Sequence, residues 1–170
     1  MSKRFPIALA ASLGMVGVLV FSVSVSAATA TANVSVSATV SVNCTVTAGT
    51  LAFGAYDPVV TNAAANLDGS GTFTVACTKS ASGVTIDLGQ GTNYSAGRRL
   101  GVASNFLSYQ LYSDSGRSTV WGSTSGGAVV NVSAPGSKAA VTYTVYGRIT
   151  SGQDVPAGNY VDTVVATVNF

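Results

Sequence analysis

Histidine and glutamate are both absent from this chain of 170 residues, and charged residues make up only 8% of it. Globular proteins usually carry about 25% charged residues. Without histidine, neither a Ser-His-Asp nor a Cys-His catalytic arrangement can form, and the commonest side-chain ligand of transition metals is missing. We therefore expect a protein that is not an enzyme and that holds no cofactor or metal ion.

The little charge that is present begins with Lys3 and Arg4. An apolar run follows over residues 7–25, and small residues lead up to Ala27. This layout is typical of a secretory signal peptide, so residues 1–27 are predicted to be removed after Ala27, with Ala30 as the alternative cleavage site. Because the run is nearly long enough to cross a bilayer, an uncleaved membrane anchor is the other interpretation.

Removal of the signal would leave six Lys and Arg residues against six aspartates. Such a neutral chain has no basic stripe for nucleic acid and no polybasic segment for an anionic membrane surface. We expect a secreted protein with no nucleic-acid partner and no stable membrane insertion after signal removal.

Cysteine is as scarce as charge, with only Cys44 and Cys77 in the chain. An isolated pair in an exported protein predicts one disulfide bond. Two thiolates without histidine or further cysteine would make a poor zinc site, so a metal site is disfavoured.

What remains is rich in Val, Thr, Ser, Ala, Gly and Tyr, interrupted about every ten residues by turn residues. Many short strands at this spacing predict a β-sandwich or barrel. The expected strands are 34–47, 51–56, 71–78, 83–88, 107–112, 128–132, 139–149 and 160–170, with turns at 55–58, 67–71, 89–91, 115–116 and 134–136.

The two ends of this region point to an association between copies. From Ala32 to Val42 apolar and polar residues alternate strictly, which is longer than one strand usually needs, so residues 28–38 could project from the domain. At the other end, Tyr160–Phe170 is a predicted strand with no hairpin partner after it. A spare strand and a vacant edge suggest head-to-tail strand exchange, which propagates into a fibre. Pairing of the N-terminal strand within its own chain is the simpler alternative.

A series of short stretches from Cys44 to Phe170 resembles the spore coat protein U domain, the domain of archaic (Csu-type) chaperone–usher pilin subunits. The matching stretches are Leu51–Pro58, Phe73–Thr78, Arg98–Leu100, Leu107–Asp114, Trp121–Gly122, Tyr143–Ile149, Gly158–Val164 and Val168–Phe170.

The resemblance implies an all-β fold: an incomplete immunoglobulin-like β-sandwich that lacks its final strand and has an N-terminal donor-strand extension. The implied partners are copies of itself or related pilin subunits, a periplasmic chaperone and an outer-membrane usher. The implied domains are a signal peptide over 1–27, a donor-strand extension over 28–38 and a pilin-type β-sandwich over 39–170.

The implied site has two parts. The donor strand would insert the small apolar side chains Ala32, Val34, Val36 and Ala38. The edge strand of the acceptor groove would contain Tyr160, Val161, Val164, Val165, Ala166, Val168 and Phe170.

We therefore expect a structural pilus subunit, exported to the periplasm and polymerised by donor-strand exchange into a surface fibre for adhesion or biofilm formation. The alternatives are a spore or cell-envelope coat protein of the same family and a monomeric secreted polysaccharide-binding module. In the last case Tyr109, Tyr112, Trp121, Tyr143 and Tyr146 could form a sugar platform, although packing in the sandwich core is favoured for most of them. The arginines 98, 99, 117 and 148 are expected to pair with aspartates or to face solvent.

Overall fold

The structure is a computed structural model that describes residues 22–170, so residues 1–21 of the predicted signal peptide lie outside the described residues. Residues 39–170 form one compact unit, and residues up to Ala38 form a separate one. The described part of that separate unit, residues 22–38, contains no helix or strand.

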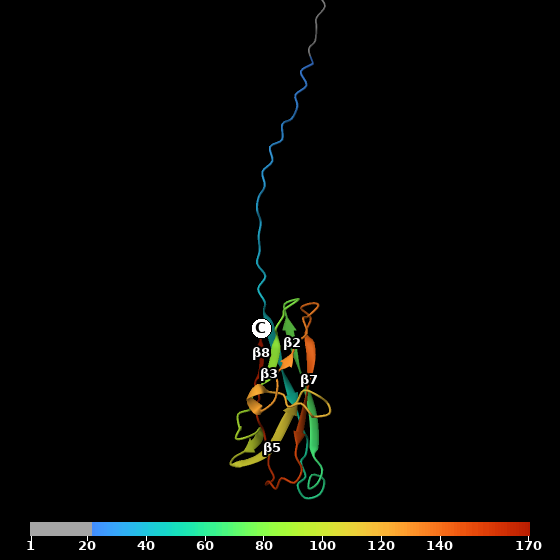
Figure 1. The fold of residues 1–170 in the computed structure, drawn as a ribbon, viewed down its shortest axis with the longest axis vertical. Helices are drawn as coiled ribbons and strands as arrows, with labels where there is room; N and C mark the ends of the chain where they lie inside the picture. Colours follow the sequence, from blue (N-terminus) through green and yellow to red (C-terminus); the bar gives the residue numbers. More distant parts are fainter. Residues whose placement is uncertain (1–21) are drawn as a thin grey trace, which may run out of the picture. The chain divides into compact units, whose positions relative to one another are not determined.

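The compact unit is built from strands (Figure 1). They are β1 (Cys44–Leu51), β2 (Leu67–Cys77), β3 (Thr85–Leu88), β4 (Arg99–Val102), β5 (Asn105–Tyr112), β6 (Val130–Asn131), β7 (Val141–Ile149) and β8 (Ala166–Asn169), with a short 3-10 helix η1 (Ser123–Ser125) between β5 and β6. No helix within residues 22–170 has the length and apolar character needed to cross a membrane.

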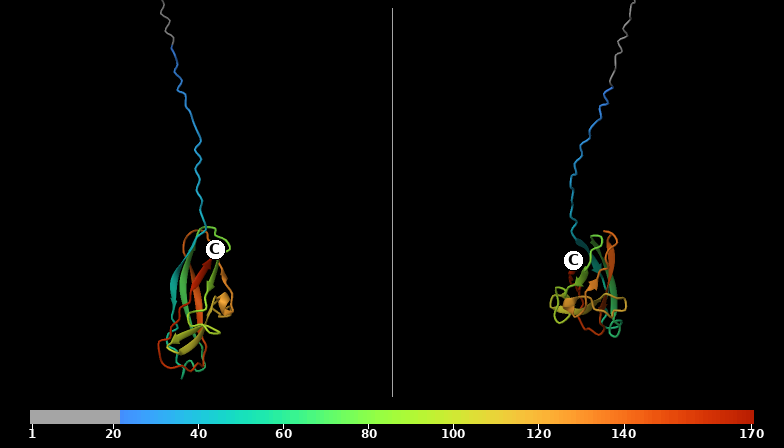
Figure 2. Two further views of the ribbon diagram at one scale, coloured as in Figure 1. Left: turned by 90° about the vertical axis from the view of Figure 1, so that its left-hand side faces the viewer. Right: turned by 45° about the horizontal axis from the view of Figure 1, so that its top comes forward.

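Two antiparallel sheets form the layers of a sandwich (Figures 1 and 2). One has the strand order β1-β2-β7-β5-β4 and the other has the order β6-β3-β8. In an immunoglobulin domain the sheets contain strands A-B-E-D and C-F-G. In the order of the strands across the first sheet, β1, β2, β7 and β5 correspond to A, B, E and D, while β3 and β8 of the second sheet correspond to C and F. Within residues 22–170 no strand takes the G position beside β8, so the predicted incomplete immunoglobulin-like fold is confirmed.

The hydrophobic core lies between the two sheets. In the second halves of β2 and β7 every second residue is buried, with Phe73 and Val75 on one strand and Val145 and Ile149 on the other. The facing sheet contributes further residues, of which Ile86 is fully buried. This alternation explains why these strands could be recognised in the sequence, since only one face of each is removed from water.

The disulfide between Cys44 and Cys77 is present, and it joins neighbouring residues of β1 and β2. Their Cα atoms are 4.1 Å apart, and the two residues pair directly across the strands. The prediction is therefore confirmed, and the bond fixes the register of β1 on its only strand partner.

Several predicted boundaries are wrong. The expected strand 34–47 begins only at Cys44, the expected strand 51–56 has strand structure at Leu51 alone, and β4 was not predicted. The expected turn at 67–71 is instead the first half of β2. Its glycines have a packing role, because a Cβ atom on Gly71 would lie 2.1 Å from the carbonyl oxygen of Thr50 on β1. A glycine inside a strand often marks such a close backbone approach.

The expected strand 160–170 is an extended segment that changes sheets. Val161 pairs with Gly101 of β4 at the edge of the five-stranded sheet, whereas β8 pairs with β3 of the other sheet. Between them, the carbonyls of Thr163 and Val165 accept hydrogen bonds from Thr92 and Gly89. The whole segment is thus held along one side.

Candidate strand-binding groove

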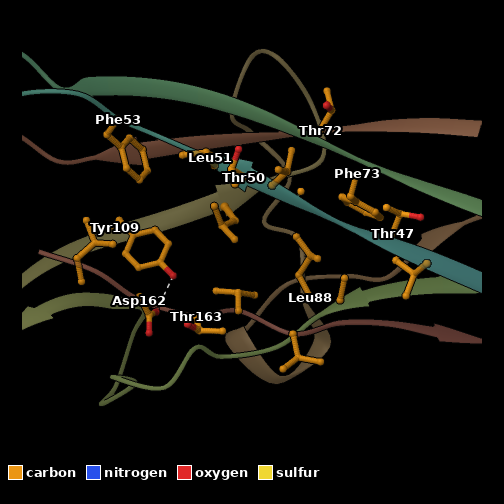
Figure 3. Close-up of a pocket in the computed structure, with 18 residues that line it drawn as sticks. Thr47, Thr50, Leu51, Phe53, Thr72, Phe73, Leu88, Tyr109, Asp162 and Thr163 are labelled. Carbon is orange, nitrogen blue, oxygen red and sulfur yellow. Dashed lines mark hydrogen bonds between the residues drawn. The ribbon is translucent and has the colours of Figure 1, made fainter.

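A groove of about 570 Å³ lies where the two sheets leave their edges open. Among residues 22–170, β1 pairs only with β2, and β8 pairs only with β3, so each has one free edge there. Figure 3 shows Thr47, Thr50 and Leu51 of β1 across from Asp162 and Thr163. The lining is completed by Val46, Gly49, Phe53, Thr72, Phe73, Leu88, Leu100, Tyr109, Leu111, Val145, Val164, Val165 and Ala166.

The floor of the groove is the hydrophobic core itself. Phe73, Leu88, Leu111 and Val145 are buried residues of that core, and all four also line the groove. The opening therefore exposes the inside of the sandwich along the line where an immunoglobulin domain would have strand G.

The backbone along one wall is free to pair. The carbonyls of Val161, Thr163 and Val165 accept hydrogen bonds of 2.8, 3.2 and 2.8 Å from the side away from the groove. Because alternate residues of a strand direct their N–H and C=O groups to opposite sides, those of Val164 and Ala166 point toward the groove. Unpaired groups of this kind are a template for an added strand.

A polar cluster centred on Asp162 lies at one end of the groove. The hydroxyl of Tyr109 donates a 2.7 Å hydrogen bond to Asp162 (Figure 3). Asp162 also accepts bonds from the Thr92 hydroxyl and the backbone N–H of Asn93. Burial first, and then the bond to Asp162, raise the pKa of Tyr109 well above its ordinary value. These bonds anchor the segment at the point where it changes sheets.

A second cavity of about 620 Å³ continues from this end. It is bordered by the connection after β1, residues 52–58, and by residues 155–161. Leu51, Phe53, Leu100 and Asp162 line both cavities, so the two are contiguous.

Arg98 supports the wall formed by residues 161–166 from inside the sandwich, because it binds the carbonyl of Gly89, whose N–H donates to Val165. Only 1% of this residue is exposed, and its guanidinium donates to the carbonyls of Leu88, Gly89 and Trp121 at 2.7–2.9 Å. A further bond of 2.7 Å reaches the side-chain oxygen of Gln110. Burial lowers the pKa of Arg98. The expectation that this arginine pairs with an aspartate or faces solvent is wrong, because its guanidinium N–H groups donate mainly to buried backbone carbonyl oxygens.

The other arginines follow the expectation more closely. Arg117 and Arg148 both pair with Asp68, at 3.2 and 2.7 Å. Arg99 instead lies over the ring of Phe106, 4.0 Å from its centre.

Three of the five aromatic residues considered for a sugar platform pack in or against the hydrophobic core. Tyr109 and Trp121 are buried in the core, and Tyr143 stacks on Phe73 with ring centres 5.9 Å apart. Within residues 22–170 no cluster of three or more cysteine, histidine or acidic side chains is placed to hold a metal ion.

The residues predicted for the acceptor edge lie in three different settings. Val164, Val165 and Ala166 line the groove, whereas Tyr160 and Val161 line the second cavity. Beyond them, Val168 packs against the core and Phe170 is exposed.

Sequence reasoning missed the opposite wall, which β1 forms with Val46, Thr47, Gly49, Thr50 and Leu51. The alternating pattern runs without a break from the N-terminal stretch into β1, so it did not show where the domain begins. The one available signal was Cys44, which marks where the chain is tied to β2.

The predicted donor residues belong to the separate N-terminal unit. Ala32, Val34, Val36 and Ala38 are all exposed and have no secondary structure. Their role as a donor strand stays a prediction.

Comparison with known proteins places the chain in a family. Residues 30–167 match the family described as the Spore Coat Protein U domain. Protein U of Myxococcus xanthus is 43% identical over 133 residues, covering 72% of this chain and 72% of that protein.

A solved structure of a chaperone–tip adhesion subunit complex, CsuC–CsuE from the archaic chaperone–usher Csu pili of Acinetobacter baumannii, is also similar. It has 25% sequence identity, a TM-score of 0.49, and covers 78% of this chain. This chain spans 40% of that solved chain. The match over residues 30–167 and the identity to Protein U show that the chain belongs to the Spore Coat Protein U domain family.

Proposed function

We propose that the protein is a structural subunit of a surface fibre that assembles by donor-strand exchange. In this proposal, residues 28–38 of one copy occupy the groove of the next copy. The observation that carries it is the groove between the free edges of β1 and β8, which opens the apolar core at the position of a missing strand.

The chemistry of the N-terminal segment suits this groove. Its even-numbered residues, including Val34 and Val36, are apolar, and the odd-numbered ones are Asn, Ser or Thr. A strand inserted there would turn one face to the core and the other to water. Each valine buried in the groove would contribute about 1.5–3 kcal/mol to the free energy of binding, and the donor backbone would pair with the free strand edges.

The direction of insertion follows from the fold. Strand G of an immunoglobulin domain runs antiparallel to strand F. A donor antiparallel to β8 would have its Ala32 end near Val168 and its Ala38 end near Asp162. The folded domain of the donor copy would then begin beyond the end of the groove at which Asp162 lies.

An open hydrophobic groove also needs protection before assembly. We infer that a periplasmic chaperone supplies a temporary strand and that an outer-membrane usher directs the exchange, as the resemblance to Csu-type pilins implies. The exported subunit would pass through the periplasm and end in a surface fibre that serves adhesion or biofilm formation.

The test is deletion of residues 28–38 with the signal peptide retained, in cells that make the fibre. Fibres should disappear from the surface while the subunit is still exported. Normal fibres from the deleted chain would contradict the proposal.

A pair of neighbouring substitutions gives a sharper comparison. Val36→Asp places a charge on the face that enters the groove and should abolish assembly, because an unpaired buried charge is strongly unfavourable. Ser35→Asp places the same charge on the solvent face and should leave assembly intact. Equal effects of the two substitutions would exclude an alternating inserted strand.

A second candidate is a spore or cell-envelope coat protein, and the match to the family described as the Spore Coat Protein U domain favours it. The same strand exchange would then build a coat instead of a filament. Immunogold labelling distinguishes the two, since it would mark either thin fibres or a continuous layer.

A further inference from the structure

The connection between β1 and β2 presents two exposed valines at one end of the domain. Val59 is 81% exposed and Val60 is 74% exposed, and Pro58 precedes them. Figures 1 and 2 place this connection at the end of the domain opposite the C-terminus. We call Pro58–Val60 the valine tip.

The valine tip is held firmly from within. The Asp57 carboxylate accepts the backbone N–H groups of Val59 and Val60 at 2.9 and 3.1 Å. The side chain of Asn62, a residue only 2% exposed, accepts from the N–H of Asp57 and donates to the carbonyl of Ala65. The polar groups of the loop are thus used internally while two apolar side chains face water. A prearranged surface loses little conformational entropy when it binds.

The opposite end of the domain carries its own exposed apolar residues. Val42, Val141 and Phe170 are all exposed. Val42 precedes β1, and Val141 begins β7 opposite Val75, near the disulfide. Figures 1 and 2 show the C-terminus at this same end. We call these three residues the apolar base.

We propose that the valine tip of one copy packs against the apolar base of the next copy along the fibre. This inference rests on the proposed function, because the direction of the inserted donor strand brings the apolar base of the donor copy next to the valine tip of the acceptor copy. The Ala38 end of the donor leaves the groove beside Asp162, where the second cavity leads to Pro58. The five residues 39–43 can span at most about 18 Å, so the donor's domain must begin close to the valine tip.

The contact differs from strand exchange in its chemistry and its role. It joins one surface of a copy to a different surface of the next copy, so it repeats from copy to copy along a fibre. Strand exchange alone would leave successive domains connected by a linker of five residues. A tip-to-base contact would fix the angle between them and stiffen the fibre.

The first test compares fibres assembled from Val59→Ser/Val60→Ser subunits with fibres from Val59→Ile/Val60→Ile subunits. The serine fibres should still form, but with a shorter persistence length in electron micrographs. In isolated domain pairs the equilibrium constant for the tip-to-base contact should fall about tenfold or more, since the burial free energy of one valine corresponds to at least that factor. The isoleucine fibres should remain as stiff as wild type. Serine fibres of unchanged stiffness would overturn the proposal.

The second test does not depend on how the serine variant folds. Fibres made from an equal mixture of Val60→Cys and Val141→Cys subunits should form disulfide-linked pairs under mild oxidation. A mixture of Val60→Cys with Ser115→Cys is the control. Ser115 follows β5 beside the middle of β7, so it lies away from the apolar base, which contains the first residue of β7. Equal cross-linking in both mixtures, or none in the first, would overturn the contact.

The outcomes separate this inference from the proposed function. One outcome is that Val36→Asp abolishes fibres while the serine substitutions leave stiffness unchanged and the cysteine pair forms no cross-link. That result would support strand exchange and refute the tip-to-base contact. If Val36→Asp fibres assemble normally, the proposed function itself fails.

Discussion

At the scale of single residues, two buried polar groups shape the groove. Arg98 binds three backbone carbonyls, and the N–H of one of these residues, Gly89, donates to the carbonyl of Val165 in the groove wall. Tyr109 and Asp162 hold the other end. Neither role could be predicted from the sequence, because only the folded chain brings Arg98 to its carbonyls and Tyr109 to Asp162.

Replacing Arg98 by methionine should destabilise the domain strongly. The change keeps an apolar chain of similar length but leaves the carbonyls of Leu88, Gly89 and Trp121 without their donor. Each unsatisfied buried acceptor costs about 1–3 kcal/mol, so a loss of roughly 3 kcal/mol or more is expected. Arg98→Lys keeps the charge and part of the bonding and should lose less. Urea unfolding of the purified chain measures both, and equal stability of Arg98→Met and wild type would contradict the role of Arg98.

The bond between Tyr109 and Asp162 predicts a dependence of stability on alkaline pH. Burial and this bond raise the pKa of Tyr109 above its ordinary value of 10.0. The unfolded chain therefore loses the phenol proton first, and the stabilisation present below pH 10 is lost as the pH rises above it. Relative to Tyr109→Phe, wild type should lose about 1.4 kcal/mol of unfolding free energy for each further pH unit. Unfolding curves from pH 9 to 12 test this, and parallel curves for the two proteins would refute it.

At the scale of elements, β1 is the strand on which the groove depends most. Within the described part of the chain it has a strand partner on one side only, and the disulfide to Cys77 fixes its first residue. The existence of most strands was predictable because their apolar residues alternate. Their limits were not, since Gly69 and Gly71 were interpreted as a turn but allow β1 to cross closely over β2.

Removing the disulfide should loosen this wall of the groove. Closing a loop with a sequence separation of 33 is worth about 3–4 kcal/mol in the chain-entropy estimate. A Cys44→Ala/Cys77→Ala chain should lose about that much unfolding free energy. Wild type measured in a reducing agent is the matched control and should lose the same amount. A loss in only one of the two would show that the effect does not come from the cross-link.

At the scale of the whole molecule, the groove joins segments from the two ends of the domain. β1 forms one wall and residues 162–166 form the other, about 115 residues later in the chain. The core residues that form its floor come from both sheets. Such a site leaves no local motif, because each wall is an ordinary strand in the sequence.

A separate peptide of residues 28–43 should stabilise a chain whose own donor segment is disabled. In the full-length Val36→Asp protein, the peptide at one hundred times its dissociation constant should raise the unfolding free energy by about 2.7 kcal/mol. The same peptide with Asp in place of both Val34 and Val36 is the control and should have no effect. Thermal unfolding with each peptide decides the matter, and stabilisation by both would argue against a groove that selects the alternating face.

The sequence by itself determined the all-β fold class and the disulfide bond. Alternating apolar residues and a lone cysteine pair are properties of composition and spacing, so they could be interpreted without coordinates. The tertiary structure decided where the domain is open. Only the pairing of the strands shows that β1 and β8 have free edges beside each other, because a vacancy in a sheet depends on which backbone groups find partners in space.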